Sequence, residues 1–152
     1  MMGLGLFVLS GEQARAQQAQ LTNLSDVSFG VLSTTANDMS RSQNVCAYAA
    51  SVSGQYGVRA QGSGTGGALT LAGSSTPLAY EVQWAASSNQ SSGTALPANT
   101  TVGGFSDGLL NNTCSLLTTT SASLIVMLRA TALSSVTAGG YSGTLTLILA
   151  PQ

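Results

Sequence analysis

The chain has no histidine and no lysine, and charged residues make up only 6% of its 152 residues. Without histidine no Ser–His or Cys–His relay can activate a nucleophile, and without lysine a Ser–Lys pair is excluded too. Four arginines and five acidic residues leave a formal net charge of −1. Nucleic acids and anionic lipids are bound through concentrated positive charge, so the composition predicts neither as a partner.

Carboxylates are the remaining candidates for catalysis. A glycoside hydrolase needs two of them facing each other across the scissile bond. Beyond residue 16 the candidates are Asp26, Asp38, Glu81 and Asp107. Glu81 faces outward in an alternating strand pattern, and Asp26 and Asp107 lie at turns, so we interpret them as solubilising or turn residues. We predict that the chain is not an enzyme and binds no cofactor.

The first residues have the pattern of an export signal. Residues 3–9 form an apolar run that is too short to span a bilayer, and Ala14-Arg15-Ala16 offers the small-x-small pattern of a signal-peptidase site. We predict a signal peptide over residues 1–16. No Lys or Arg precedes the apolar run, so we expect the true start of the signal peptide to lie upstream of Met1. A disordered or helical tail is the alternative. Residues 17–152 are then expected to form one exported domain without a membrane span.

Two cysteines, Cys46 and Cys114, agree with export. An even pair in a secreted domain is most often a disulfide, and two thiols without histidine or a second cysteine pair cannot complete a zinc site. The cysteines are 114 − 46 = 68 positions apart. Closing that loop stabilises the fold by about 4 kcal/mol in the chain-entropy model. Two buried free thiols are the alternative to the disulfide, and no metal site is expected.

Short alternating apolar runs separated by Gly, Ser and Thr turns predict an all-β sandwich of about seven strands, without sustained helical periodicity. Residues 45–50 and 56–60 are expected to form a hairpin that turns at Ser53-Gly54. The predicted strands cover residues 27–31, 45–50, 56–60, 68–72, 78–84, 123–129 and 141–149, and residues 100–105 are a candidate for a short edge strand.

The clearest strand pattern covers residues 78–84. Leu78, Tyr80, Val82 and Trp84 alternate with outward-facing side chains such as Glu81. Tyr80 and Trp84 could form a platform on which a sugar stacks. Their phase with Leu78 and Val82 favours a position in the core.

Two sequence motifs resemble those of nucleotide-binding proteins and hydrolases. Gly62-x-Gly64-x-x-Gly67 matches the dinucleotide-binding fingerprint, but that loop must open a helix, and the strand-like residues 68–72 follow it. We interpret it as a turn. Residues 139–143 lack the G-x-S-x-G spacing of a nucleophile elbow.

The last predicted strand, residues 141–149, is the most apolar and ends three residues before Gln152. No later segment of this sequence can pair with it. We therefore expect an incomplete sandwich that lacks its final strand. An open edge of this kind pairs readily with a strand of another chain.

Several of these segments together resemble a known family. The resemblance to the spore coat protein U-like domain, the pilin family of archaic chaperone–usher fimbriae, covers about residues 24–151. Its most specific part is the pattern over residues 138–147, and the Tyr-x-Val-x-Trp strand is second. The segments that carry it are Val45-Cys-Ala-Tyr48, Gly54-Gln-Tyr56-Gly-Val58, Leu78-Ala-Tyr80-Glu-Val82-Gln-Trp84, Cys114 and Ala138-Gly-Gly-Tyr141-Ser-Gly-Thr-Leu145-Thr-Leu147.

Such pilins resemble immunoglobulin-like sandwiches without their final strand. A periplasmic chaperone fills the groove first, and the N-terminal strand of the next subunit then replaces it. The resemblance implies a structural subunit of an extracellular fimbria that serves surface adhesion or biofilm formation. Its implied partners are the periplasmic chaperone, the outer-membrane usher and other pilin subunits. The expected lining of the acceptor groove is Val27, Phe29, Val31, Leu145, Leu147 and Leu149.

One segment departs from the family pattern. A donating pilin carries alternating aliphatic residues ahead of its first strand, whereas residues 17–24 are mostly polar. The chain is therefore expected to accept a strand without donating a good one, as at the end of a fibre. The alternative function is a secreted or fibre-tip binding module, an adhesin, whose loops at 62–67 and 87–99 contact a surface or glycan.

Overall fold

The computed structural model describes residues 19–32, 36–51, 53–73, 75–106, 114 and 119–152. The predicted signal peptide and Asp107 lie outside these ranges. The described strands are β1 (Ala19–Thr22), β2 (Met39–Ala49), β3 (Gln55–Gly62), β4 (Thr70–Leu71), β5 (Leu78–Ala79), β6 (Glu81–Ala85), β7 (Thr94–Ala95), β8 (Thr101–Ser106), β9 (Ala122–Leu128) and β10 (Leu145–Pro151).

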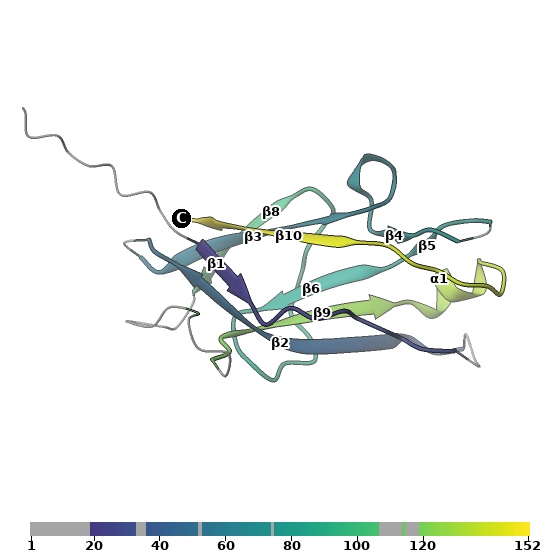
Figure 1. The fold of residues 1–152 in the computed structure, drawn as a ribbon, viewed down its shortest axis with the longest axis horizontal. Coiled ribbons are helices and arrows are strands. Elements are labelled where there is room, and N and C mark those ends of the chain that lie inside the picture. Colours follow the sequence, from purple (N-terminus) through teal and green to yellow (C-terminus); the bar gives the residue numbers. More distant parts are fainter. Residues whose placement is uncertain (1–18, 33–35, 52, 74, 107–113, 115–118) are drawn as a thin grey trace, which may run out of the picture.

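The strands form two main antiparallel layers. One sheet has the order β1-β2-β9-β6-β7, the other has the order β10-β3-β8, and β4 pairs with β5. Figure 1 shows β3, β8 and β10 on one side of the molecule and β2, β9 and β6 on the other. The predicted all-β sandwich is confirmed.

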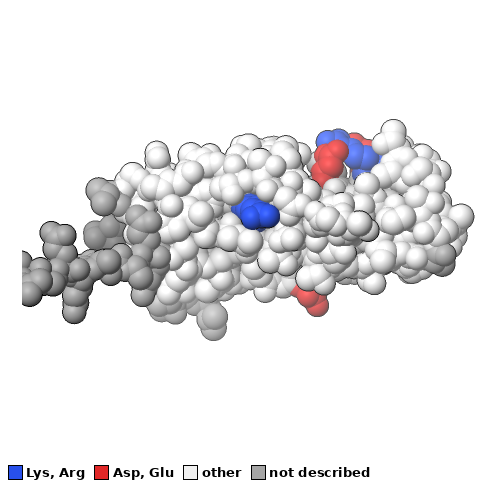
Figure 2. All heavy atoms as spheres, turned by 90° about the horizontal axis from the view of Figure 1, so that it is seen from above, with Lys and Arg blue, Asp and Glu red and all other residues white. Residues whose placement is uncertain are grey.

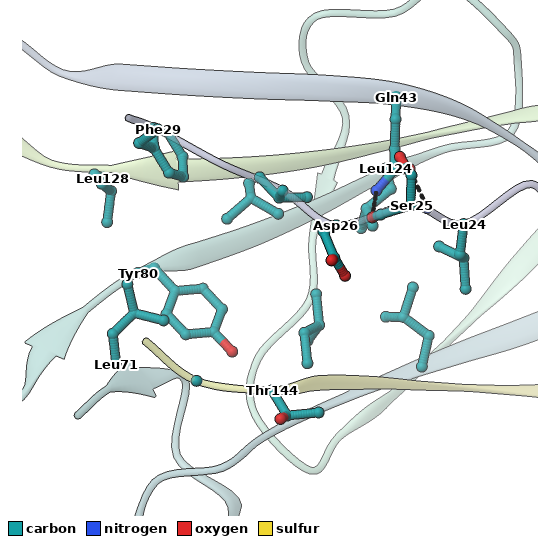
Figure 3. A pocket seen from close by; sticks show the side chains of 15 residues that line it. Leu24, Ser25, Asp26, Phe29, Gln43, Leu71, Tyr80, Leu124, Leu128 and Thr144 are labelled. Atoms are coloured by element: carbon teal, nitrogen blue, oxygen red, sulfur yellow. Dashed lines mark hydrogen bonds between the residues drawn. The ribbon is translucent and has the colours of Figure 1, made fainter. Parts of the chain in front are cut away.

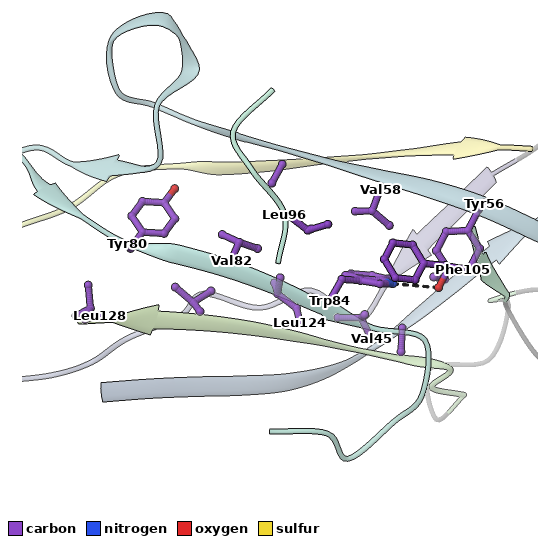
Figure 4. Packing of buried hydrophobic residues seen from close by; sticks show 14 of the residues in the cluster. Val45, Tyr56, Val58, Tyr80, Val82, Trp84, Leu96, Phe105, Leu124 and Leu128 are labelled. Carbon is purple, nitrogen blue, oxygen red and sulfur yellow. Dashed lines mark hydrogen bonds between the residues drawn. The ribbon is translucent and has the colours of Figure 1, made fainter. Parts of the chain in front are cut away.

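Aromatic side chains fill the space between the layers. Trp84 of β6 and Tyr56 of β3 are fully buried, with ring centroids 6.3 Å apart and ring planes at 89°. Phe105 of β8 packs on Tyr56 at 5.8 Å (Figure 4). Tyr80 is only 7% exposed. The interpretation of Trp84 and Tyr80 as core residues, and not as a sugar-stacking platform, is confirmed.

The predicted strand over residues 78–84 is present but divided at Tyr80. β5 pairs with β4, whereas β6 pairs with β9. Between them, the Tyr80 amide donates a hydrogen bond to the Leu69 carbonyl, 3.0 Å away. The inward alternation continues through this change of partner, so Leu78, Tyr80 and Val82 all face the core.

The predicted hairpin between residues 45–50 and 56–60 is wrong. Both strands exist, but β2 pairs with β1 and β9, while β3 pairs with β8 and β10 in the opposite sheet. The chain thus crosses between layers where a tight turn was expected. A hairpin would place both strands in one sheet, whereas here Val45 and Val58 are buried between the layers from opposite sides.

Two short helical segments lie outside the predicted strands. Residues Thr65–Gly67 form the 3₁₀ turn η1, where Gly66 and Gly67 have φ of 68° and 81°, and β4 follows it, so the turn interpretation of the glycine motif is confirmed. The five-residue helix α1 (Ala130–Ser134) is too short for periodicity to reveal it. Within the described ranges, no helix is long and apolar enough to cross a bilayer.

A disulfide joins Cys46 of β2 to Cys114, with their Cα atoms 5.6 Å apart. The predicted pairing is confirmed, and the alternative of free thiols is wrong. The bond closes a loop of 68 positions that contains the strands from β3 to β8. It therefore restricts the unfolded chain strongly.

Candidate functional site

β10 lies at the edge of its sheet. It pairs with β3 from Leu145 opposite Gly62 to Pro151 opposite Tyr56, and no strand among the described residues pairs with its other edge. Leu145 and Leu147 are half-buried against the core, whereas Ile148 points outward and is 43% exposed. The predicted alternation of the last strand is confirmed, and β10 keeps one free edge within the described part of the chain.

A segment without strand pairing, residues 24–29, lies opposite β10. The predicted strand over residues 27–31 is wrong, because residues 23–32 form no ladder. The chain leaves β1 through Asn23, whose φ is 65°, a left-handed conformation that ends the extended pairing.

The side chain of Gln43 on β2 holds this segment in place. Its Oε1 accepts hydrogen bonds from the Ser25 amide and from Ser25 Oγ, both at 2.9 Å, and its Nε2 donates to the Ser25 carbonyl at 3.1 Å. The glutamine amide thus takes the place of a peptide group in a neighbouring strand. Further along, Arg41 stacks over the Phe29 ring at 5.6 Å.

A cavity of about 360 Å³ lies between this segment and β10. Its floor is the inward face of β9, formed by Leu124, Val126 and Leu128, with Leu71 and Tyr80 at one end. Figure 3 shows the side chains of both walls pointing into the shared space. We call this cavity the groove. Its lining is Leu24, Ser25, Asp26, Val27, Phe29, Gln43, Leu71, Tyr80, Leu124, Val126, Leu128, Gly143, Thr144, Leu145 and Leu147.

Four of the six residues expected in the groove line it: Val27, Phe29, Leu145 and Leu147. Val31 is fully exposed beyond the groove, and Leu149 packs half-buried against the core near Val58, its partner on β3. That the four residues accept a strand stays a prediction.

The floor residues Leu124, Val126 and Leu128 were missed as groove residues, although they alternate within the predicted strand over residues 123–129. Periodicity shows that a face is buried but not which segments cover it. The wall residue Leu24, 48% exposed, and Asp26 were also missed. Their segment has no strand partner, so no pairing rule brings it to the groove.

Two polar side chains interrupt the apolar lining. Asp26 is the one charged residue among the described residues of the lining, and it forms no ion pair with any of them. The Tyr80 hydroxyl has no hydrogen-bond partner within the described ranges, and burial raises the pKa of Tyr80. Figure 3 shows the Asp26 carboxylate and the Tyr80 hydroxyl projecting into the groove.

The other described acids, Asp38 and Glu81, do not line the groove. Asp38 and Glu81 both bind Arg129, each at 2.8 Å, and Asp38 Oδ1 also accepts a hydrogen bond from the Ala130 amide. The two carboxylates therefore share one guanidinium instead of facing each other across a cleft. Seen from the side of β3, β8 and β10, the surface carries few charged side chains (Figure 2).

Comparisons with known proteins include a distant structural similarity. No family model matches the chain, and no curated protein matches it. The chain is similar to one in the crystal structure of a chaperone–tip adhesion subunit pre-assembly complex from the archaic chaperone–usher Csu pili of Acinetobacter baumannii. The identity is 18%, the TM-score is 0.46, and the alignment covers 88% of this chain but only 39% of that one. This similarity is too low to assign a function.

Proposed function

We propose that this chain is a structural subunit of an extracellular fimbria, and that its groove accepts an extended strand donated by another polypeptide. The observation that carries the proposal is the groove beside the free edge of β10. A strand laid along that edge can form backbone hydrogen bonds with β10 and place every second side chain over the apolar floor.

The energy of such an insertion is large relative to the stability of a domain. A strand that buries three or four aliphatic side chains gains about 1.5–3 kcal/mol from each. The sum of about 5–12 kcal/mol is comparable with the whole net stability of an ordinary domain. The chain without a donated strand is therefore expected to be marginally stable or prone to aggregate.

The proposed partners are those that the family resemblance implies. A periplasmic chaperone would fill the groove after export, and a neighbouring subunit would replace it at the outer-membrane usher. Within this chain, β1 already pairs with β2 from Ala19 opposite Ala49 to Thr22 opposite Cys46. Those residues are engaged in the body of the domain, which supports a subunit that accepts a strand more readily than it donates one. Surface adhesion or biofilm formation is the role proposed for the assembled fibre.

The test uses the exported full-length chain and an added peptide of alternating aliphatic residues. The peptide should raise the midpoint of thermal unfolding of the wild-type protein. Leu147→Asp puts a charge into the groove and should abolish this stabilisation. Ile148→Asp is the matched control, because it puts the same charge on the outward face of β10 and should leave the response intact.

Two results would contradict the proposal. One is a stable wild-type monomer whose unfolding no aliphatic peptide changes. The other is an equal response in the two variants, which would place the bound peptide outside the groove. Because Leu147 is only half-buried in the open groove, the variant is expected to fold, and its circular dichroism spectrum checks this directly.

A further inference from the structure

Once the groove is accepted as a strand-binding site, its two polar side chains restrict which strand fits. An entirely aliphatic strand would cover Asp26 and the Tyr80 hydroxyl without offering either a partner. Removing a charged or polar group from water without a replacement hydrogen bond is costly. The groove is therefore not matched to a uniformly apolar occupant.

The chemistry of the two groups identifies the missing partner. An ionised carboxylate only accepts hydrogen bonds, and a tyrosine hydroxyl oxygen can accept one as well. The described lining contains no basic side chain. The nearby Arg41 lies over the Phe29 ring and donates to the Ser40 carbonyl. A cation that serves both Asp26 and Tyr80 has to come from the occupant.

Resting on the proposed function, we infer that the donated strand carries one basic side chain among its aliphatic ones, and that its cationic group binds Asp26 and Tyr80. Lysine and arginine have apolar stems that pack along an aliphatic surface while the charged end reaches the rim. Asp26 is exposed at the rim, whereas Tyr80 is 93% buried, with its hydroxyl directed into the groove (Figure 3).

This requirement disfavours residues 17–24 of a second copy of the chain as the donor. Residues 17–32 contain no lysine or arginine, so such a strand would leave Asp26 without a counter-charge. The inference therefore predicts a donor that differs from this segment. A basic position within the donor also fixes the register, because a shift by two residues separates the cation from Asp26.

The test uses the full chain and aliphatic peptides in which one inward position is lysine or the isosteric, uncharged norleucine. A matched lysine and norleucine peptide is made for each inward position of the strand. At one position the lysine peptide should bind about tenfold more tightly than the norleucine peptide, as expected for a hydrogen bond to a charged group. The preference should shrink in high salt, and a peptide of residues 17–24 should bind weakly.

Variants assign the preference to the two side chains. Asp26→Asn should abolish the preference for the lysine peptide and leave the affinity of the norleucine peptide equal or higher. Tyr80→Phe should reduce the preference for the lysine peptide. Asp38→Asn removes a carboxylate outside the groove and should leave it unchanged. With Asp26→Lys, a glutamate peptide should bind better than a lysine peptide.

The outcomes separate this inference from the proposed function. If norleucine and lysine peptides bind equally at every position, the strand-accepting groove stands and the basic side chain is rejected. A lysine preference that persists in Asp26→Asn also rejects it. If no peptide binds at all, both the inference and the proposed function are wrong.

Discussion

The indole nitrogen of Trp84 donates a hydrogen bond to the hydroxyl oxygen of Tyr56 across the two sheets, over 3.1 Å. Both side chains are fully buried, so neither group can turn to water. This contact joins β6 of the larger sheet to β3 of the smaller one, and it fixes the distance between the layers at the end of the core marked by Phe105 (Figure 4).

Tyr56→Phe should therefore lower the free energy of unfolding by about 1–3 kcal/mol, because it leaves the Trp84 N–H buried without its acceptor. Urea denaturation measures the loss. The control is Tyr141→Phe, whose hydroxyl donates to the Thr137 carbonyl at the surface and whose removal should cost less than about 0.5 kcal/mol. Equal losses of unfolding free energy in the two variants would show that the buried hydrogen bond stabilises the fold no more than the surface one.

Reduction of the Cys46–Cys114 disulfide should destabilise the domain by about 4 kcal/mol, since the unfolded chain regains the entropy of a 68-position loop. Urea denaturation with and without reductant gives this difference. A variant with both cysteines changed to serine should match the reduced protein and be insensitive to reductant. A reductant effect that persists in this variant would exclude the disulfide as its cause.

How far the sequence predicts this fold depends on whether the relevant contact is local. The alternation over β6 and β9 predicts two buried strands, because the polarity of each side chain indicates whether it faces the core or the solvent. The order of strands depends on contacts between distant segments, and the failed hairpin between β2 and β3 shows this. Both strands were recognised, but their partners, β9 and β10, come much later in the chain.

The groove shows the same limit at the level of single residues. Leu145 and Leu147 could be predicted because β10 is a regular strand. Val27 and Phe29 line the groove together, as their alternation predicted, yet their segment is not a strand. At Ser25 its backbone binds the Gln43 side chain and not a neighbouring strand. A side chain that replaces a backbone partner leaves no periodic signal. Asp26 and Tyr80 line the same cavity only because the fold brings the junction between β5 and β6 beside that segment.

Acid should weaken the ion-paired cluster around Arg129. The Ala130 amide hydrogen bond, followed by the Arg129 hydrogen bond, holds the pKa of Asp38 below its ordinary value of 3.8. A depressed pKa in the folded state means that the stabilisation is fully present above the ordinary value and is lost as the pH falls below it. Wild-type protein should therefore unfold at a higher temperature than Asp38→Asn near neutral pH.

The difference in unfolding temperature between wild type and Asp38→Asn should narrow below about pH 4. There the Asp38 carboxyl of the unfolded chain begins to take up a proton, and the folded one follows only at lower pH. Thermal unfolding of both proteins from pH 7 to pH 2.5 measures the difference, and comparing the two removes the contribution of the other acids. A constant difference through the acid range would mean that Asp38 stabilises the fold by some means other than its charge.

The last prediction concerns the clamp between Gln43 and Ser25, which holds one wall of the groove. Gln43→Ala removes all three of its hydrogen bonds to Ser25, and because these are exposed the loss of global stability should be only about 1 kcal/mol. The local effect should be larger. Residues 24–29 have no ladder to hold them, so their amide hydrogen exchange should accelerate while that of β9 stays unchanged.

Because those residues form the wall opposite β10, Gln43→Ala should also weaken the binding of an aliphatic peptide, which must then pay for ordering the wall. Gln61→Ala on β3 is the control, because Gln61 lies outside the groove and should affect neither exchange at residues 24–29 nor peptide affinity. If Gln43→Ala accelerates exchange but leaves affinity unchanged, residues 24–29 are not part of the binding surface. The donated strand would then depend on β10 and the β9 floor alone.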